Sequence, residues 1–153
     1  MAGRSLILIG LIGVLFGFRC YADAWDFRLG LADFPRQNTM LGLEVTRILS
    51  LSESAELGIG GVVRTDFTQT VGPGILSRFQ YWLTQNFALG VLGEFGYLYH
   101  QNFSNPDSYS YFFAGPVFSI QIKPVFIQWD PGEIFYLGTS QLIPLRLAFG
   151  LFF

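Results

Sequence analysis

The chain has 153 residues, of which 51% are hydrophobic and only 13% are charged, and its formal net charge is −2. Ordinary soluble domains carry about 25% charged residues, and nucleic-acid-binding domains gather basic side chains into patches. The composition therefore excludes a basic nucleic-acid-binding domain. A mean hydropathy of +0.42 favours a protein that meets lipid.

The first residues have the three parts of a secretory signal peptide. Arg4 supplies the basic start, residues 6–18 form a short apolar core, and Ala22 and Ala24 are small residues at the positions that a signal peptidase recognises. We therefore expect cleavage after Ala24. The chain then divides into a signal peptide, residues 1–24, and one mature domain, residues 25–153.

The alternative for this first segment is a membrane anchor helix. The apolar core is shorter than the ~20 residues that a spanning helix needs, and Arg19 interrupts it, so a cleaved signal is the better interpretation. The sole cysteine, Cys20, lies within the signal. We therefore expect no disulfide and no thiol chemistry in the mature domain.

The mature sequence alternates between large apolar residues and small or polar ones. Successive side chains of a β-strand point to opposite faces, so each alternating segment has one apolar face and one polar face. In the clearest segment, residues 87–100, Val91 and Phe95 share the apolar face while Gly90 and Glu94 share the other. The expected strands lie at about residues 25–32, 38–49, 55–67, 75–84, 87–100, 110–122, 125–137 and 143–153.

The course of the segment 125–137 has two alternatives. The sequence Asp-Pro-Gly-Glu at residues 130–133 interrupts its alternation. Either one strand continues through these residues with a bulge, or they form an additional turn. We count eight strands in all, and this even number is expected to return both ends of the mature domain to the periplasmic side.

Eight strands of this length are what a small membrane barrel needs, because a tilted strand of about ten residues crosses a bilayer. We therefore expect an all-β fold, an eight-stranded antiparallel up-and-down transmembrane β-barrel with its apolar faces outward. The alternative is a soluble secreted barrel that binds a small ligand and has its faces reversed. Its surface would consist mostly of Gly, Ala and Ser with scattered charges, which suits a soluble protein poorly.

The last residues carry a second signature. Arg146, Ala148, Leu151 and Phe153 follow the spacing polar, x, Gly, x, x, hydrophobic, x, hydrophobic, with Ala148 in place of the usual glycine. This pattern resembles the C-terminal assembly signal of bacterial outer-membrane β-barrels. Over its whole length the chain is similar to the small barrels of the outer-membrane protein A and X type.

The resemblance implies a location and partners. It places the mature domain in the outer membrane of a Gram-negative-type bacterium. The implied partners are the lipid bilayer, lipopolysaccharide and, during biogenesis, the barrel-assembly machinery. A monomer is expected, because barrels of this kind close on themselves.

Charged residues on the inward faces are predicted to form an interior polar network. An eight-stranded barrel is just wide enough to be filled by side chains, and a buried charge is very costly unless it is paired. A filled interior leaves no open pore, and it resembles the salt-bridge networks inside the small outer-membrane barrels. The predicted members are Arg28, Glu44, Glu56, Arg64, Asp66, Arg78, Glu94 and Arg146.

His100, the only histidine, lies close in sequence to Ser104 and Asp107. A base, a hydroxyl and an acid are the minimum set for acyl transfer, and this set resembles that of the lipid A acyltransferase and deacylase barrels. The deacylases' His-x-Ser near the chain end is missing, as are the early His and amphipathic helix of the palmitoyl transferases. We therefore expect no catalytic site, and His100, Ser104 and Asp107 are the candidates if there is one.

Cofactor and metal chemistry find no support in the sequence. One histidine and no mature cysteine give no transition-metal site, and the glycines recur at strand spacing without forming a nucleotide fingerprint. The predicted function is a structural or surface-interaction role in the outer membrane, without an open pore. The alternative is a lipid A-modifying barrel enzyme of the acyltransferase or deacylase type.

Overall fold

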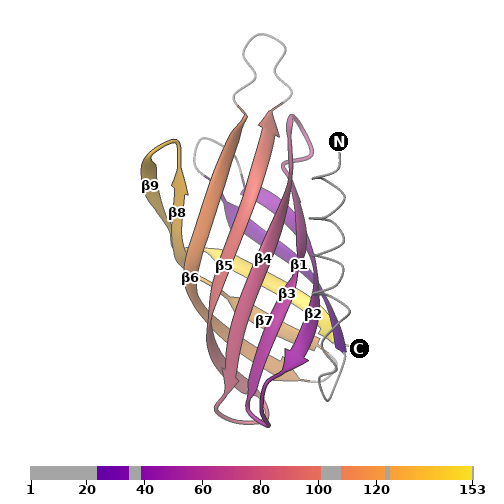
Figure 1. Ribbon diagram of the computed structural model, residues 1–153. Helices are drawn as coiled ribbons and strands as arrows, with labels where there is room; N and C mark the ends of the chain where they lie inside the picture. The colour runs from indigo at the N-terminus through magenta and orange to yellow at the C-terminus, as the bar shows by residue number, and fades with distance from the viewer. Residues whose placement is uncertain (1–23, 35–38, 101–107, 123–124, 153) are drawn as a thin grey trace, which may run out of the picture.

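The computed structural model describes residues 24–34, 39–100, 108–122 and 125–152, and all the regular structure in them is β-strand (Figure 1). In this part of the chain no helix is long and apolar enough to cross a membrane. The strands are β1 (Ala24–Asp33), β2 (Thr39–Ser50), β3 (Ala55–Thr65), β4 (Thr70–Trp82), β5 (Phe87–His100), β6 (Tyr109–Ile122), β7 (Val125–Trp129), β8 (Gly132–Tyr136), β9 (Thr139–Ile143) and β10 (Arg146–Phe152).

The strands close into a barrel. Each strand from β1 to β6 pairs antiparallel with the next, and β10 pairs with both β7 and β1. The closed wall therefore consists of eight strands, β1 to β7 and β10. The predicted eight-stranded antiparallel up-and-down barrel is confirmed.

The last part of the wall is broken into a hairpin. β7 ends at Trp129, Asp130 and Pro131 follow, and β8 then pairs with β6 further along. Pro144 and Leu145 separate β9 from β10 in the same way. Proline has no N–H to donate to a ladder, so each break coincides with a residue that cannot continue the pairing. The structure thus contains the additional turn, and the hairpin β8–β9 extends from β6 at one end of the barrel (Figure 1).

The two ends of the barrel differ. At one end, here called the turn end, residues 51–54 and 83–86 make tight connections; at the other, the loop end, lie residues 66–69 and the tip of the hairpin β8–β9 (Figure 1). That tip is Leu137-Gly138, with φ of 48° and 75°. Two consecutive positive φ values are typical of a type I′ turn, which matches the twist of a two-stranded hairpin.

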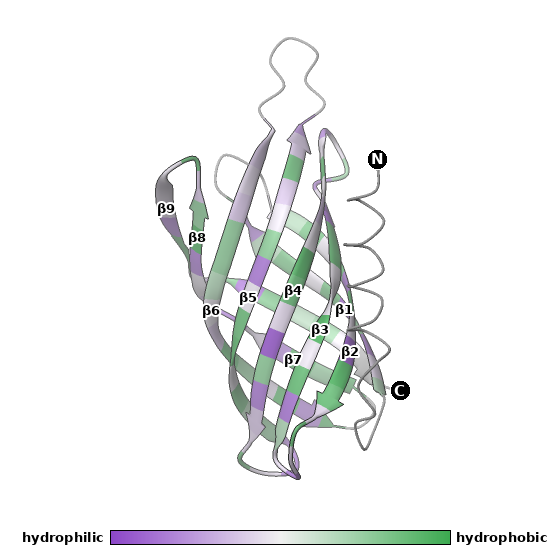
Figure 2. Cartoon of the chain, in the orientation of Figure 1, coloured by the Kyte–Doolittle hydropathy of each residue, from purple (hydrophilic) through white to green (hydrophobic). Residues whose placement is uncertain are grey.

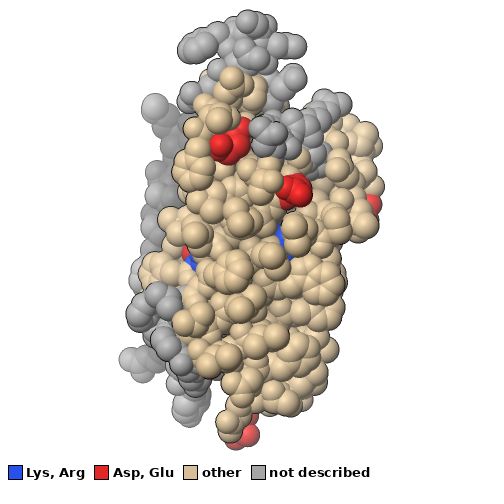
Figure 3. Space-filling view, turned by 180° about the vertical axis from the view of Figure 1, so that it is seen from behind, with Lys and Arg blue, Asp and Glu red and all other residues tan. Residues whose placement is uncertain are grey.

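The outer face of the wall is apolar. Large side chains such as Leu43, Val91 and Phe95 are more than half exposed, at 55%, 60% and 53%. Along each strand apolar and polar residues alternate (Figure 2), and few charged side chains interrupt the middle of the face seen from behind (Figure 3). This arrangement is the reverse of a soluble barrel, whose Leu and Phe face would be buried.

The interior has three layers. Near the loop end it is apolar, and Met40, Leu98, Phe113 and Ile134 are fully buried there in one cluster. Towards the middle and the turn end the inward residues become charged and then amide- or hydroxyl-bearing, as in Gln80, Ser119 and Gln128. The barrel is therefore packed throughout, with its charges held between an apolar layer and a polar one.

Candidate functional site

Four arginines and four carboxylates meet in the middle of the barrel. Neighbouring strands bring them together because inward positions face each other across the ladder: Arg28 is the register partner of Glu44, and Gly42, which has no side chain, is the partner of Arg64. The eight residues are Asp26, Arg28, Glu44, Arg64, Arg78, Glu94, Asp130 and Arg146, each at most 5% exposed. We call this set the charge network.

Glu94 is the most heavily bonded member of the charge network. Its Oε1 accepts hydrogen bonds from Arg64 Nε at 2.6 Å and from the Tyr111 hydroxyl at 2.5 Å. Its Oε2 accepts from Arg64 Nη2 and from Arg146 Nη2, both at 2.6 Å. One carboxylate from β5 therefore joins side chains from β3, β6 and β10, across the width of the barrel.

The remaining acids extend the charge network in both directions along the barrel. Glu44 Oε1 accepts from Arg146 Nη2 at 3.1 Å and more distantly from Arg64 Nη2 at 3.4 Å. Asp26, nearer the turn end, accepts from Arg28 Nε at 2.8 Å and from Arg78 Nη2 at 2.7 Å. Four positive and four negative groups balance, which is the condition for burying them all in their ionised form.

Asp130 belongs to the charge network, although its sequence context predicts only an interruption of the strand. Its Oδ2 lies 2.7 Å from Arg146 Nε, and its backbone N–H donates to Arg146 O at 3.0 Å. The available signal was its parity, because Phe126 and Gln128 on β7 and Asp130 directly after it take alternate positions and all three are buried. The turn motif at residues 130–133 concealed that periodicity.

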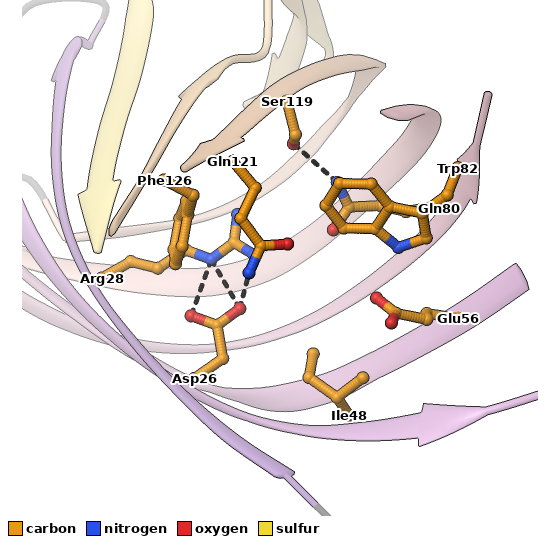
Figure 4. Close-up of a pocket in the computed structure, with 9 residues that line it drawn as sticks. All are labelled: Asp26, Arg28, Ile48, Glu56, Gln80, Trp82, Ser119, Gln121 and Phe126. Carbon is orange, nitrogen blue, oxygen red and sulfur yellow. Dashed lines mark hydrogen bonds and ion pairs between the residues drawn. The ribbon is translucent and has the colours of Figure 1, made fainter. Parts of the chain in front are cut away.

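Two predicted members lie elsewhere. Asp66 follows the last residue of β3, and its side chain binds the loop between β3 and β4. Glu56 lies at the turn end, half-buried, where it lines a small cavity together with Asp26, Arg28 and Trp82 (Figure 4). The prediction that both belong to the network is wrong about their position along the barrel axis. Strand parity predicts which face a residue is on, but it does not predict how near the residue lies to the end of its strand, and these two lie at or next to the ends of β3.

The small cavity shows how tightly the interior is filled. Its volume is about 10 Å³, which is room for about one water molecule. Figure 4 shows Arg28 and Asp26 bonded to each other on one side of it and Gln80 bonded to Ser119 on the other. On the loop-end side of the cavity, the charge network and the apolar layer fill the interior. The cavity is therefore closed off by packed side chains on that side.

Asp66 is expected to stabilise its loop only when it is ionised. Its Oδ1 accepts the backbone N–H groups of Thr68, Gln69 and Thr70 at 2.8–2.9 Å. Partial burial raises the pKa of Asp66, but these N–H groups outweigh burial and hold the pKa well below its ordinary 3.8. A lowered pKa means that the stabilisation is present above about pH 4 and is lost as the pH falls towards the folded-state value.

The corresponding measurement is hydrogen exchange of the loop amides at neutral pH. Asp66→Asn should speed exchange at Thr68 and Thr70 about tenfold, the effect of losing about 1.4 kcal/mol of charge-assisted bonding. Asp33→Asn, which changes another exposed acid at the loop end, serves as the control. Equal protection in Asp66→Asn and wild type would show that the carboxylate does not hold the loop.

The candidate catalytic residues are only partly within the described chain. His100 ends β5, and its Nδ1 lies 3.0 Å from the Thr70 hydroxyl on β4. Ser104 and Asp107 lie outside the described residues. Within those residues no group of three or more His, Cys, Asp or Glu side chains could hold a metal ion.

The predicted assembly signal is divided in the same way. Arg146, its polar position, is buried and ion-paired in the charge network. Leu151 is the register partner of Phe27 on β1 and of Val125 on β7. Phe153 lies outside the described residues. Arg146, the polar position of this predicted signal, therefore also forms ion pairs inside the barrel.

Comparison with known proteins identifies the fold. The crystal structure of the N-terminal β-barrel domain of Pseudomonas aeruginosa OprF matches with a TM-score of 0.60 and 10% sequence identity, covering 86% of this chain and 98% of that one. No protein-family model matches the chain, and no curated protein does. The chain thus has the fold of an eight-stranded outer-membrane barrel, as its sequence resemblance implied.

Proposed function

We propose that this protein is a monomeric barrel of the bacterial outer membrane with a structural or surface-interaction role and no open pore. In this proposal residues 1–24 direct export and are removed, and residues 25–153 insert into the bilayer. Support comes from the apolar outer face, the closed antiparallel wall and the likeness to an outer-membrane barrel. A closed wall suits lipid because every ladder group finds a partner within it.

The observation that carries the proposal is the filled interior. Arg64, Arg78 and Glu94 are at most 1% exposed, and the apolar layer covers them on the side of the loop end. Barrels that conduct solutes have more strands and a water-filled lumen. An eight-stranded wall whose centre is a neutral, bonded charge network offers solutes no continuous path.

The test is reconstitution of the mature barrel into planar bilayers and sugar-loaded vesicles. We expect no regular unit currents and no sugar efflux, while a porin prepared in the same way gives both. Insertion is checked separately by recovery of the protein in the outer-membrane fraction after urea extraction. Unit currents from a folded, inserted barrel would contradict the closed interior, and extraction by urea would contradict the membrane location.

A further inference from the structure

A hollow at the turn end of the barrel continues into the small cavity of Figure 4. This turn-end hollow lies between the turns 51–54 and 83–86 and the end of β6, and its volume of about 760 Å³ is within the range of small-molecule sites. Glu56, Trp82 and Gln121 line both the hollow and the cavity, so they form the passage between the two (Figure 4). A ligand in the hollow can therefore place one small group in the cavity.

The lining of the cavity includes two hydrogen-bond donors and one acceptor that have no partner among the described residues. Arg28 is 5% exposed; its Nε and Nη2 donate to Asp26, whereas its buried Nη1 makes no hydrogen bond. The buried Trp82 Nε1 makes none either. The acceptor is the half-buried Glu56, whose carboxylate forms no hydrogen bond or ion pair with the described residues. Figure 4 shows the indole nitrogen of Trp82 on the side that faces Glu56.

These three groups match a hydroxyl. A hydroxyl oxygen accepts two hydrogen bonds and donates one, and a cavity of about 10 Å³ has room for about one such oxygen. A carbonyl has no proton to donate to Glu56, an ammonium group cannot accept from Arg28 or Trp82, and a carboxylate is larger and is repelled by Glu56. A water molecule offers the same bonds as a hydroxyl, so the lining of the hollow decides what delivers the group.

The turn-end hollow has the lining of a saccharide site. Gln85 and Asn86 offer amide groups that both donate and accept, and they lie in one lining with the indole of Trp82. A sugar ring has an apolar face that can pack on an indole and hydroxyl groups at its edge that bond to amides. Among the described residues of the lining, the charged side chains are Glu53 and Glu56, which disfavour a phosphate or a carboxylate on the ligand.

The walls of the turn-end hollow are held in place by hydrogen bonds between the turns and the strands. Asn86 Nδ2 donates to Gln121 O at 2.7 Å, and the Gln121 N–H donates to Asn86 O at 2.8 Å. The Trp82 N–H donates to Ser54 O at 2.7 Å. The hollow is therefore formed before a ligand enters it, as is usual for small-molecule sites.

We propose that the turn-end hollow binds an uncharged saccharide, with the hydroxymethyl group of one hexose unit in the cavity. Its hydroxyl accepts from Arg28 Nη1 and Trp82 Nε1 and donates to Glu56, and the rest of the saccharide contacts the turn 83–86. In the proposed function the short turns face the periplasm, so the saccharide is a periplasmic one. Binding itself needs only the folded barrel and does not rest on the membrane location.

The test titrates the protein with methyl glucoside, methyl galactoside and methyl N-acetylglucosaminide, all of which carry a hydroxymethyl group. The barrel is held in lauryldimethylamine oxide, a detergent without sugar, and the indole N–H signals are followed by NMR. Wild type should bind at least one glycoside and shift the signal of Trp82. The signal of Trp129, whose Nε1 donates to Pro144 O at 3.1 Å, should stay in place.

A matched ligand and a matched variant test the hydroxyl itself. The 6-deoxy analogue of the glycoside that binds should bind about tenfold more weakly, because Arg28 Nη1 and Glu56 are then left without a partner. Trp82→Phe keeps an aromatic ring but loses the N–H, and it should weaken binding about tenfold by calorimetry. Trp25→Phe changes an exposed indole on the outer face, outside the hollow, and should leave binding unchanged.

Three outcomes would overturn the proposal: no binding of any of these glycosides to the folded barrel, equal binding of the 6-deoxy analogue, or the same loss in Trp25→Phe. Binding of putrescine in place of the glycosides would also overturn it, because Glu53 and Glu56 would then select a cation. A heat-dependent gel shift shows which variants are folded, and the 6-deoxy comparison in wild type decides the matter if Trp82→Phe is not. An inserted, non-conducting barrel that binds no glycoside contradicts the saccharide site and leaves the proposed function standing.

Discussion

Replacing Glu94 with lysine should produce the largest loss of stability of any single charge change in this protein. The substitution removes the acceptor for Arg64, Arg146 and Tyr111 and adds a cation among the arginines that remain. Removing one partner of a buried ion pair costs about 3–5 kcal/mol, because the other charge stays buried. We expect Glu94→Lys to lower the gel-shift unfolding temperature strongly or to prevent refolding from urea.

Two companion variants separate the causes. Glu94→Gln keeps the shape of the side chain and should fall between wild type and Glu94→Lys, because an amide can still accept from one arginine. Glu53→Lys makes the same charge change at an exposed position of the turn end and should unfold as wild type does. If Glu94→Lys also unfolded at the wild-type temperature, the charge network would not be what holds the interior together.

Alternation of side chains was enough to predict the fold because lipid and a narrow interior demand opposite chemistry on the two faces. Val91 and Phe95 face outward and Glu94 inward, as their spacing predicted, and the same parity holds along β1 and β4. Strand number followed from counting such segments. The polar face also predicted that Arg64, Glu94 and Arg146 would lie inside, since in lipid a charged side chain has few other places.

The alternation of side chains along a strand does not predict the position of a residue along the barrel axis. Asp66 was assigned to the interior by its face, but it lies past the end of β3, where backbone N–H groups of a turn are nearer than any arginine. Asp130 was assigned to a turn by its neighbour Pro131, yet it is 2.7 Å from Arg146. Which arginine an inward acid meets depends on the shear between strands, which brings residues distant in sequence to one level of the barrel.

The sequence left open whether residues 130–133 form a bulge or a turn, and so it did not predict the hairpin β8–β9. Residues 130–133 indicate an interruption of the strand, but whether the chain forms a bulge or a turn there depends on the neighbouring strand. β6 continues past the point where β7 ends and offers Phe112 and Phe113 as partners for Phe135 and Ile134. The pairing partner, and not the local motif, determines the outcome.

Deleting Phe153 should abolish accumulation of the barrel in the outer membrane. The prediction follows from the resemblance of Arg146, Ala148, Leu151 and Phe153 to an assembly signal, in which the terminal aromatic residue is recognised before the barrel closes. The deleted protein should collect as aggregate or fragments in the periplasm, measured by fractionation and immunoblotting. Phe153→Tyr keeps an aromatic ring at the end of the chain and should restore most of the yield.

Refolding in detergent distinguishes recognition from stability. Over the described residues, the pairing that closes the wall runs from Ala32 with Arg146 to Asp26 with Phe152. The deletion therefore leaves the described ladder between β1 and β10 complete, and the urea-denatured protein should refold in micelles with the wild-type gel shift. Failure to refold would mean that Phe153 acts through packing. Normal yield in cells would show that the C-terminal pattern is not an assembly signal at all.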